Sequence, residues 1–398
     1  MTPELINKKL SPLVSMLDQL PNDCLSRFLS KTIPKMVRDV LFEMPSHFAS
    51  NSLPYLESGT PSSMKLTPGE CFGLVSCTFF CIPLYKENHA LVRDTTFVEF
   101  FKDSPRLVAK LTCLVEYFNA VVKVRTEGSH IQQAALLGSR DVEITRIVGD
   151  KEAWRGSEWW LANNQRLTDF IVHLDSERIE DHKNAAHADF ANRCVGGGVL
   201  SKGCVQEEVR MIIAPELLVA CLVCAPMDHH EAVIVTGTAK FTTYEGYDKN
   251  FNCTGLTEII SKIINDDCHS FPVVETDEVL CIDAIPFRSE TGKQYEPVAI
   301  LRELEKVRIG LSGISSTSFA TGNWGCGVFG GDPKLKSLIQ WIAASVSDKE
   351  LHYYPFGDVR VADLKNVVSK LSSWTVGELL STLFTSSTQN LFEHILRL

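Results

Sequence analysis

The chain has 398 residues, of which 44% are hydrophobic and 22% charged, proportions typical of a soluble globular protein. Lys and Arg number 39 against 49 Asp and Glu, giving a net charge of −10. That charge argues against sequence-independent binding of duplex nucleic acid or an anionic membrane. The longest apolar run, 217–227, is too short to cross a bilayer, and the first ten residues lack a signal peptide's apolar segment. We expect a cytoplasmic or nuclear protein with no membrane contact.

A chain of this length exceeds the size at which one hydrophobic core stops growing, so two regions are expected. In residues 1–140, Thr67-Pro68-Gly69-Glu70 has the pattern of a capping box with proline at the first helical position. Ser104-Pro105 begins a second helix, in which apolar residues recur at spacings of three and four. Because no catalytic motif occurs here, we expect a helical accessory region.

Residues 141–398 alternate short runs of β-formers with longer helical patterns. This alternation predicts a largely parallel sheet covered by helices, with ligands bound at the carboxyl ends of the strands. The expected strands are 169–174, 232–236, 279–285, 316–320 and 352–356, and the expected helices are 207–221, 297–309 and 333–345. Beyond Val361 we expect two further helices, separated near Ser372.

Two cysteine and histidine patterns resemble metal sites but have simpler interpretations. Cys221 and Cys224 have zinc or redox spacing, yet they lie in the most apolar run and are expected to pack in the core. The segment 228–231 reads Asp-His-His-Glu, but adjacent side chains diverge, which favours a turn before a strand. The sequence therefore predicts no metal and no cofactor.

The first glycine-rich segment is Gly196-Gly197-Gly198, followed eight residues later by Gln206-Glu207-Glu208. Three glycines alone fit a tight turn as well as a loop that presents N–H groups to an anion at a helix N-terminus. Two adjacent carboxylates and an amide beside that loop favour a site that performs chemistry.

The second glycine-rich segment, 321–333, contains a formal G-x-G-x-x-G at Gly325, Gly327 and Gly330. We reject a dinucleotide fingerprint, because that motif belongs to the first βα unit of a Rossmann fold. A strand, a glycine loop and a helix capped by Asp332 remain, which predicts a second phosphate-binding loop. Two such loops on one sheet suit a pyrophosphate, even without a basic residue.

Three aromatic residues, Tyr244, Tyr247 and Phe251, follow a glycine-bearing strand. Aromatic residues at these positions are equally compatible with two roles, half-buried packing and stacking on a nucleotide base.

Together these motifs resemble the poly(ADP-ribose) glycohydrolase family. The similarity rests on 189–193 (Asp-Phe-Ala-Asn-Arg), the triple glycine with Gln206-Glu207-Glu208, and four further segments in matching order: 179–181, 236–247, 321–332 and 356–358. It covers about residues 165 to 360. The resemblance implies an α/β, macrodomain-like mixed sheet flanked by helices, with an N-terminal helical accessory region at 1–140 and the catalytic domain with C-terminal helices at 141–398. It also implies hydrolysis of the ribose–ribose O-glycosidic bond.

The resemblance also implies residue roles. Three catalytic residues are implied: Glu208 as the general acid and base, Glu207, which with Asn192 holds the ribose hydroxyls, and Asp189 as a supporting catalytic carboxylate. The implied contacts to the pyrophosphate and distal ribose are Gly197, Gly198, Asn323, Gly327, Val328 and Phe329. The implied contacts on the adenine side are Ile179, Glu180, Gln206, Tyr244, Tyr247 and Phe356. Val328 stands where the family usually has alanine.

The chemistry agrees with these roles, because a sugar hydroxyl leaves only when it is protonated. Helix neighbours point about 100° apart, so Glu207 and Glu208 are not expected to flank one anomeric carbon. We expect a monomer that acts on poly(ADP-ribose) and ADP-ribosylated proteins, mainly from the chain end. A module that only binds ADP-ribose, and a hydrolase of another ADP-ribosyl bond, are the alternatives.

Overall fold

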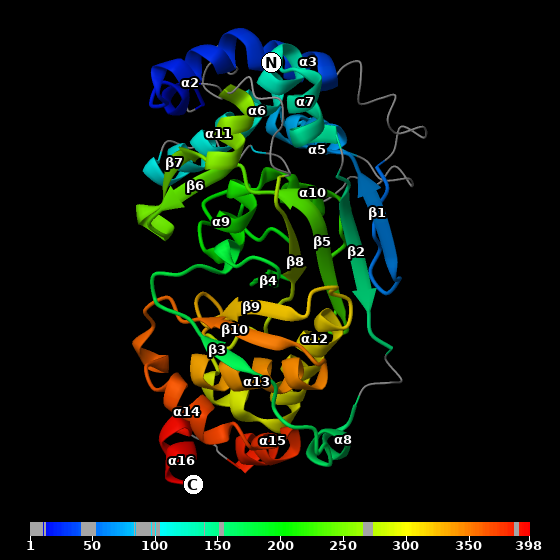
Figure 1. Cartoon of the computed structure of the whole chain (residues 1–398), viewed down its shortest axis with the longest axis vertical. Coiled ribbons are helices and arrows are strands. Elements are labelled where there is room, and N and C mark those ends of the chain that lie inside the picture. The colour runs from blue at the N-terminus through cyan, green and yellow to red at the C-terminus, as the bar shows by residue number, and fades with distance from the viewer. Residues whose placement is uncertain are drawn as a thin grey trace.

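The computed structural model in Figure 1 describes residues 11, 13–40, 53–82, 84, 97, 100, 104–138, 140–150, 155–265, 274–385 and 390–398. Within these residues, eight strands form one sheet in the order β1-β2-β5-β8-β4-β9-β10-β3. They are β1 (Ser62–Leu66), β2 (Val142–Val148), β3 (Phe170–Val172), β4 (Ala186–Asp189), β5 (Glu231–Ala239), β8 (Thr276–Cys281), β9 (Ser318–Gly322) and β10 (Glu350–Tyr354). A separate hairpin comprises β6 (Thr242–Glu245) and β7 (Asn252–Leu256).

The sheet is mixed, and its parallel half positions the loops that matter below. Strands β8, β4, β9, β10 and β3 run parallel to one another, whereas β1, β2, β5 and β8 pair antiparallel. The five parallel strands therefore all end at the same edge of the sheet. Ligand sites in α/β sheets form at such an edge, so the loops after these strands are the place to look.

Both faces of the sheet are buried, and the side chains of β5 divide between them. Val233 and Val235 belong to one hydrophobic core, and Ala232 and Ile234 belong to the other. This follows from the strand geometry, in which successive side chains point to opposite faces. The N-terminal helices share the first core, and the C-terminal helices share the second. In Figure 1 these two groups of helices lie at opposite ends of the long axis.

The two helices predicted in the N-terminal region are present. The side chain of Thr67 accepts from the N–H of Glu70 in a capping box that begins α5 (Pro68–Phe79). The hydroxyl of Ser104 likewise accepts from the N–H of Leu107 and begins α6 (Pro105–Glu127). The other helices on this side are α2 (Asn22–Arg27), α3 (Ile33–Arg38), α7 (His130–Gln133), α9 (Gln206–Ile213), α10 (Leu218–Val223) and α11 (Glu258–Asn265), with π-helical turns at Phe28–Thr32 and Ala134–Gly138.

On the other side, α12 (Pro297–Leu311) and α13 (Pro333–Val346) match two predicted helices closely. The remaining helices are α8 (Ser157–Leu161), α14 (Leu364–Leu371), α15 (Val376–Thr385) and α16 (Leu391–Arg397). Single 3-10 turns occur at Ile179–Asp181, Pro215–Leu217, Asp248–Asn250, Thr291–Tyr295 and Val359–Val361. None of the described helices is long and apolar enough to cross a membrane.

Two helix predictions were wrong in detail. The single helix expected at 207–221 is interrupted after Ile213, because Pro215 lacks an N–H group and begins a 3-10 turn before α10. The C-terminal stretch forms three helices and not two, although the expected break near Ser372 is present. The core position of Cys224 is confirmed, and 228–231 is the predicted turn at the start of β5.

Several strands were not predicted from the sequence, among them β1, β2 and β4. β1 lies within the predicted helical region and pairs with β2 at the edge of the sheet. The N-terminal helices and the strands also share one hydrophobic core. The domain boundary between residues 140 and 141 therefore stays a prediction. Strand β1 precedes this boundary in the sequence but belongs to the sheet that is formed mainly by residues after it.

Candidate active site

A cavity of about 1230 Å³ lies where the five parallel strands end. Segments after β3, β4, β8, β9 and β10 line it, together with the start of α9 and the β6–β7 hairpin. Fourteen of the residues expected from the sequence are among those that line it: Glu180, Asn192, Gly197, Gly198, Gln206, Glu207, Glu208, Tyr244, Tyr247, Asn323, Gly327, Val328, Phe329 and Phe356. Asp189 and Ile179 are buried instead, 1% exposed each.

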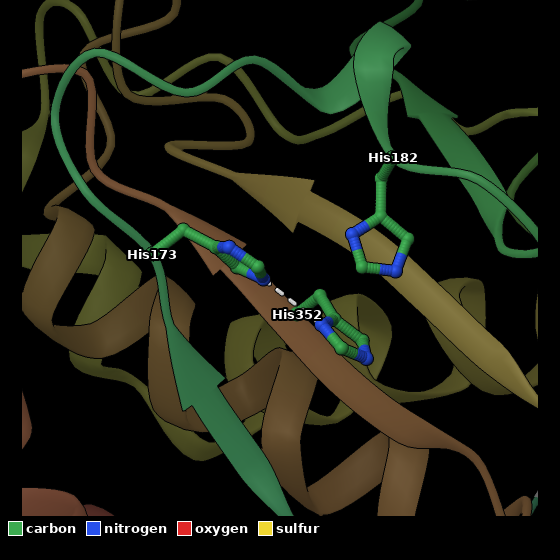
Figure 2. Close-up of side chains that lie close together, drawn as sticks. All are labelled: His173, His182 and His352. Carbon is green, nitrogen blue, oxygen red and sulfur yellow. Dashed lines mark hydrogen bonds between the residues drawn. The ribbon is translucent and has the colours of Figure 1, made fainter.

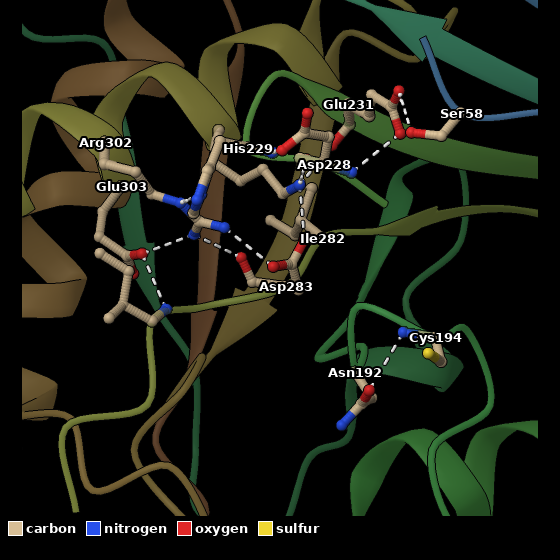
Figure 3. Close-up of polar contacts among 12 residues, drawn as sticks. Ser58, Asn192, Cys194, Asp228, His229, Glu231, Ile282, Asp283, Arg302 and Glu303 are labelled. Carbon is tan, nitrogen blue, oxygen red and sulfur yellow. Dashed lines mark hydrogen bonds and ion pairs between the residues drawn. The ribbon is translucent and has the colours of Figure 1, made fainter. Parts of the chain in front are cut away.

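Glu207 is anchored in the loop that follows β4. Its Oε2 accepts from the N–H of Asn192 at 3.0 Å, and its Oε1 accepts from the N–H of Gly196 at 2.6 Å. The side chain is 4% exposed, yet it lines the cavity. Figure 3 shows Asn192, whose Oδ1 accepts from the N–H of Cys194 at 3.0 Å and so fixes the turn that presents these donors. Both oxygens of this carboxyl group are therefore held in one orientation.

Glu208 is anchored by different N–H groups. Its Oε1 accepts from Gly198 and its Oε2 from Val205, both at 2.9 Å, and the side chain is 7% exposed. The second of these bonds joins a side chain at the third helical position to the residue that precedes the helix, which is half of a capping box. Local helix chemistry thus sets the position of Glu208.

All three glycine N–H groups of the first loop are used inside the protein. Those of Gly196 and Gly198 bind the carboxyl groups of Glu207 and Glu208, and that of Gly197 donates to the carbonyl of Cys194 at 3.1 Å. The predicted anion cradle therefore binds the chain's own carboxylates. Gly197 has φ +48°, and a Cβ there would lie 2.5 Å from Glu207 Oε2 and 2.8 Å from Glu208 Oε1. Glycine is required because both oxygens crowd this one position.

Asp189 ends β4 behind Glu207. Burial raises the pKa of its carboxyl group to about 7, and the Cys281 thiol and the charge of Arg210 act in the opposite direction. Burial also raises the pKa of Glu207 well above its usual range, and the neighbouring Asp189 adds to the effect. Two buried carboxyl groups this close cannot both ionise without a large free-energy penalty. The pair therefore keeps a proton to higher pH than two exposed carboxyl groups would.

Lys110, on α6 of the N-terminal region, holds the loop between Gly198 and Gln206. Its Nζ donates to the carbonyls of Val199, Ser201 and Gly203 at 2.6, 2.9 and 2.7 Å. The side chain is fully buried, and this burial lowers its pKa to about 8. The helical region therefore takes part in shaping the loop that holds the carboxylates.

The second glycine loop lies across the cavity. Among the described residues, the N–H groups of Gly327, Val328 and Phe329 donate to no protein acceptor, although all three residues line the cavity. Gly325 has φ +73°, and a Cβ there would lie 2.6 Å from Ala284. As predicted, Asp332 caps the following helix by accepting from the N–H of Lys334 at 3.0 Å. Successive N–H groups of this kind form an anion-binding concavity.

An ion-pair cluster supports the segment after β8, on the same side as this loop. Arg302 pairs with Asp283 at 2.8 Å and with Glu303 at 2.7 Å, and Glu303 accepts from the N–H of Ile285 at 3.0 Å (Figure 3). Lys336 also pairs with Glu303. The cluster is buried, so it holds the segment that brings Ala284 and Arg288 to the cavity.

Aromatic side chains form the remaining wall. Tyr247 is 52% exposed and Phe356 44% exposed, and both line the cavity. Phe356 has φ +53°, a conformation that costs about 1–3 kcal/mol for a residue other than glycine and that marks functional sites. Tyr244 donates its hydroxyl to Glu180 Oε1 at 2.6 Å, and the guanidinium of Arg178 lies over its ring at 4.2 Å.

Gln206 and Ile179 were expected to contact the edge of the adenine base, but both side chains make other contacts. The amide of Gln206 accepts from the N–H of Phe190 at 2.8 Å and donates to the carbonyl of Ala188 at 2.9 Å. It therefore joins α9 to the end of β4. Ile179 packs with Ala320 in a small hydrophobic cluster.

Four arginines in the cavity wall were not anticipated from the sequence, and one of them, Arg210 on α9, is buried and pairs with Asp277. Arg178, Arg288 and Arg360 come from three separate loops and line the cavity. Arg288 also donates to the carbonyl of Val328, beside the free N–H groups of the second loop. No sequence signal could have found them, because each is isolated in the chain and only the fold brings them together.

The site defines a class of protein, and comparisons with known families identify it. Residues 157–363 match the macro-domain-fold region of poly(ADP-ribose) glycohydrolase, and residues 20–133 match the helical domain of the same family. The chain is thus a macro-domain glycosidase, since the first match spans more than half of it. It belongs to the poly(ADP-ribose) glycohydrolase family.

The chain is also similar to several known proteins. The poly(ADP-ribose) glycohydrolase 1 of Arabidopsis thaliana is 26% identical, and the alignment covers 92% of this chain and 79% of that protein. Poly(ADP-ribose) glycohydrolases 1 and 2 of Caenorhabditis elegans are 30% and 32% identical; the chain spans 40% and 63% of their lengths. A crystal structure of the Deinococcus radiodurans enzyme with ADP-ribose is 15% identical, with a TM-score of 0.35, covering 53% of this chain and 86% of that one.

We expect Lys110→Met to loosen the loop between Gly198 and Gln206. Three buried carbonyls would lose their donor, which should lower the free energy of unfolding by about 2–4 kcal/mol. Amide hydrogen exchange at Gly196 and Gly198 should become faster. Lys123→Met on the same helix is the matched control, because Lys123 donates to Asn265 at the surface. Equal exchange rates in the two variants would contradict the role given to Lys110.

Asp189→Asn should stabilise the protein at high pH. The folded state holds the Asp189 proton more tightly than the unfolded chain, so its stabilising effect is greatest at low pH and is lost as pH rises from about 4 to about 7. At pH 8 the variant should gain up to about 4 kcal/mol in free energy of unfolding, at about 1.4 kcal/mol per pKa unit. Denaturant unfolding from pH 4 to 8 measures this, with exposed Asp18→Asn as control. A pH-independent difference would contradict the raised pKa.

Proposed function

We propose that this protein hydrolyses the ribose–ribose O-glycosidic bonds of poly(ADP-ribose) and releases ADP-ribose, mainly from the chain end. The observation that carries the proposal is the pair Glu207 and Glu208, fixed by backbone N–H groups in the wall of a cavity of about 1230 Å³. Such a cavity exceeds the roughly 300–1,000 Å³ of most small-molecule sites, which suits a ligand as long as a dinucleotide.

In this proposal Glu208 is the general acid and then the general base. It protonates the leaving ribose oxygen as the bond breaks, and then takes a proton from the water that attacks the oxocarbenium-like centre. Its anchoring at both oxygens supports this role, because a proton donor must be held within hydrogen-bond reach of its target.

Glu207 and Asn192 then hold the ribose hydroxyls. Glu207 accepts one N–H at each oxygen and still lines the cavity, so a lone pair remains for a sugar hydroxyl. The Nδ2 of Asn192 makes no hydrogen bond within the described residues and is available as a donor. Asp189 would support them by raising the pKa of the Glu207 carboxyl group, which lies next to it in the buried interior.

The pyrophosphate would lie against the second glycine loop. The N–H groups of Gly327, Val328 and Phe329 can donate to phosphate oxygens, and Arg288 adds positive charge beside them. The first loop would contribute the Cα atoms of Gly197 and Gly198 as a close, apolar surface, since its N–H groups are occupied.

The adenine would lie between aromatic side chains. Tyr247 and Phe356 offer exposed ring faces for stacking, and Glu180 with Tyr244 offers polar atoms for the edge of the base. A base enclosed in this way leaves little room for the polymer to continue outward, so the bound unit would be a terminal one. We further propose that the enzyme acts as a monomer in the cytoplasm or nucleus, without direct contact to duplex nucleic acid.

Glu208→Gln should reduce the release of ADP-ribose from purified polymer by about 10²- to 10⁴-fold, because glutamine has no proton to transfer. Its affinity for ADP-ribose, measured by calorimetry, should stay within a few-fold of wild type. Glu207→Gln should also be strongly impaired, through loss of ribose positioning. Glu245→Gln, an exposed position on β6, is the control. Residual turnover near wild type in Glu208→Gln would assign the acid elsewhere. Binding of ADP-ribose by the wild type without any turnover would favour a binding module.

Complete digestion of an auto-modified acceptor protein should yield monomeric ADP-ribose and leave the unit attached to the protein. A side-chain bond offers a different leaving group from the ribose oxygen at which Glu208 is aimed. Chromatography of early products and mass spectrometry of the acceptor measure the two claims separately. Mainly oligomeric early products would refute exo action, and an unmodified acceptor would refute the claim about the last unit.

A further inference from the structure

Three histidines that the proposed reaction does not use converge beside the cavity. His173 follows β3, His182 follows the 3-10 turn Ile179–Asp181, and His352 lies in β10. Figure 2 shows their rings gathered around one small space. One ring nitrogen from each lies within 4.8 Å of the others, and all three side chains are partly buried. His173 and His352 are 179 positions apart in the sequence, so only the fold brings the three histidines together.

The spacing of these nitrogens suits a metal ion. His173 Nε2 lies 2.9 Å from His352 Nδ1, and His182 completes the triangle. Nitrogens bound to zinc at 2.0–2.1 Å in a tetrahedron are roughly 3.3 Å apart, so small ring movements would place all three at that separation. The ring centroids of His182 and His352 are already 4.1 Å apart.

The outward nitrogens of two of these histidines face carboxylates. His173 Nδ1 lies 3.4 Å from Glu177 Oε1, and His352 Nε2 lies 3.6 Å from Glu350 Oε2. The inward nitrogens are the pair 2.9 Å apart. A carboxylate on the outer nitrogen fixes the ring tautomer and raises the basicity of the inner nitrogen, as is usual for histidines that bind metals.

Tyr354 supports the third histidine. Its hydroxyl lies 2.6 Å from His182 Nδ1, and its ring stacks on His173 with 4.2 Å between centroids. Each of the three rings is therefore oriented by a neighbour from β10 or from the loop that follows β3.

We propose that His173, His182 and His352 bind one divalent transition-metal ion of the zinc class, with a water molecule in the fourth position. Imidazole nitrogens favour zinc and related ions over magnesium or calcium, which prefer oxygen ligands. None of the three histidines is among the residues that line the cavity, so the ion would not take part in the glycosidic chemistry.

The ion would instead fasten the loops that form the adenine side of the cavity. Between His173 and His182 the chain contributes Arg178 and Glu180 to the cavity wall, and just after His352 it contributes Phe356. The N–H of Gly357 already donates to Asp175 Oδ1 at 3.1 Å across these two loops. A metal bond between their bases would restrict both loops and favour the conformation that binds the base.

The test uses the full-length, tag-free protein, stripped with a chelator and titrated with Zn²⁺ alone. Calorimetry should give one ion per chain, and Zn²⁺ should raise the melting temperature by several degrees. Hydrogen exchange should slow in 173–182 and 352–358. His182→Asn and His352→Asn should each weaken Zn²⁺ binding by about 100-fold or more, while exposed His394→Asn should bind as wild type does. Mg²⁺ should produce none of these effects.

Cobalt substitution tests the metal site in the wild-type protein, so its result does not depend on whether the histidine variants fold. Wild-type protein loaded with Co²⁺ should show the visible absorption bands of a four-coordinate site with three nitrogen ligands and one oxygen ligand. Absence of saturable Zn²⁺ binding by the wild type, absence of those bands, or unchanged affinity in folded His182→Asn and His352→Asn would overturn the proposal. These readouts need no substrate, so their outcome is separate from that of the proposed hydrolysis.

Discussion

Backbone N–H groups of the glycine loop and its flanks bind the carboxyl groups of Glu207 and Glu208, and the rest of the site is arranged around that contact. Burying two adjacent carboxyl groups costs free energy, unless hydrogen-bond donors of the protein replace the water molecules that they lose. The loop supplies one N–H for each of the four oxygens. Gly197 is confined to glycine by the same contact, because a Cβ would collide with both side chains.

This contact depends in turn on both regions of the chain. Gln206 ties the start of α9 to the end of β4, and Lys110 reaches from α6 to three carbonyls of the intervening loop. The N-terminal helices share a hydrophobic core with one face of the sheet. Removing that layer would expose the core and leave the loop without its lysine contact, so the helical region and the glycine loop are parts of one structural unit.

The net charge of −10 is compatible with a phosphate-bearing substrate because donors at one part of the cavity can bind a phosphate group locally. The free N–H groups of the second glycine loop and the side chain of Arg288 lie together in its wall, although acidic residues such as Glu180 and Asp358 also line the cavity. Local fields in a cleft of low dielectric constant outweigh distant surface charges, which salt screens.

The sequence alone determined the helix starts at Thr67, Ser104 and Asp332, because capping acts over three or four residues. It also determined the pairing of a glycine loop with two carboxylates, because loop and acids lie within thirteen residues. Only the tertiary structure decided what the loop binds and which arginines face the cavity. It alone brings together three histidines whose ring nitrogens lie within 4.8 Å although the chain between them is long. The strands β1 and β4 were missed for the same reason, since strand pairing joins distant segments and no local pattern records the partner.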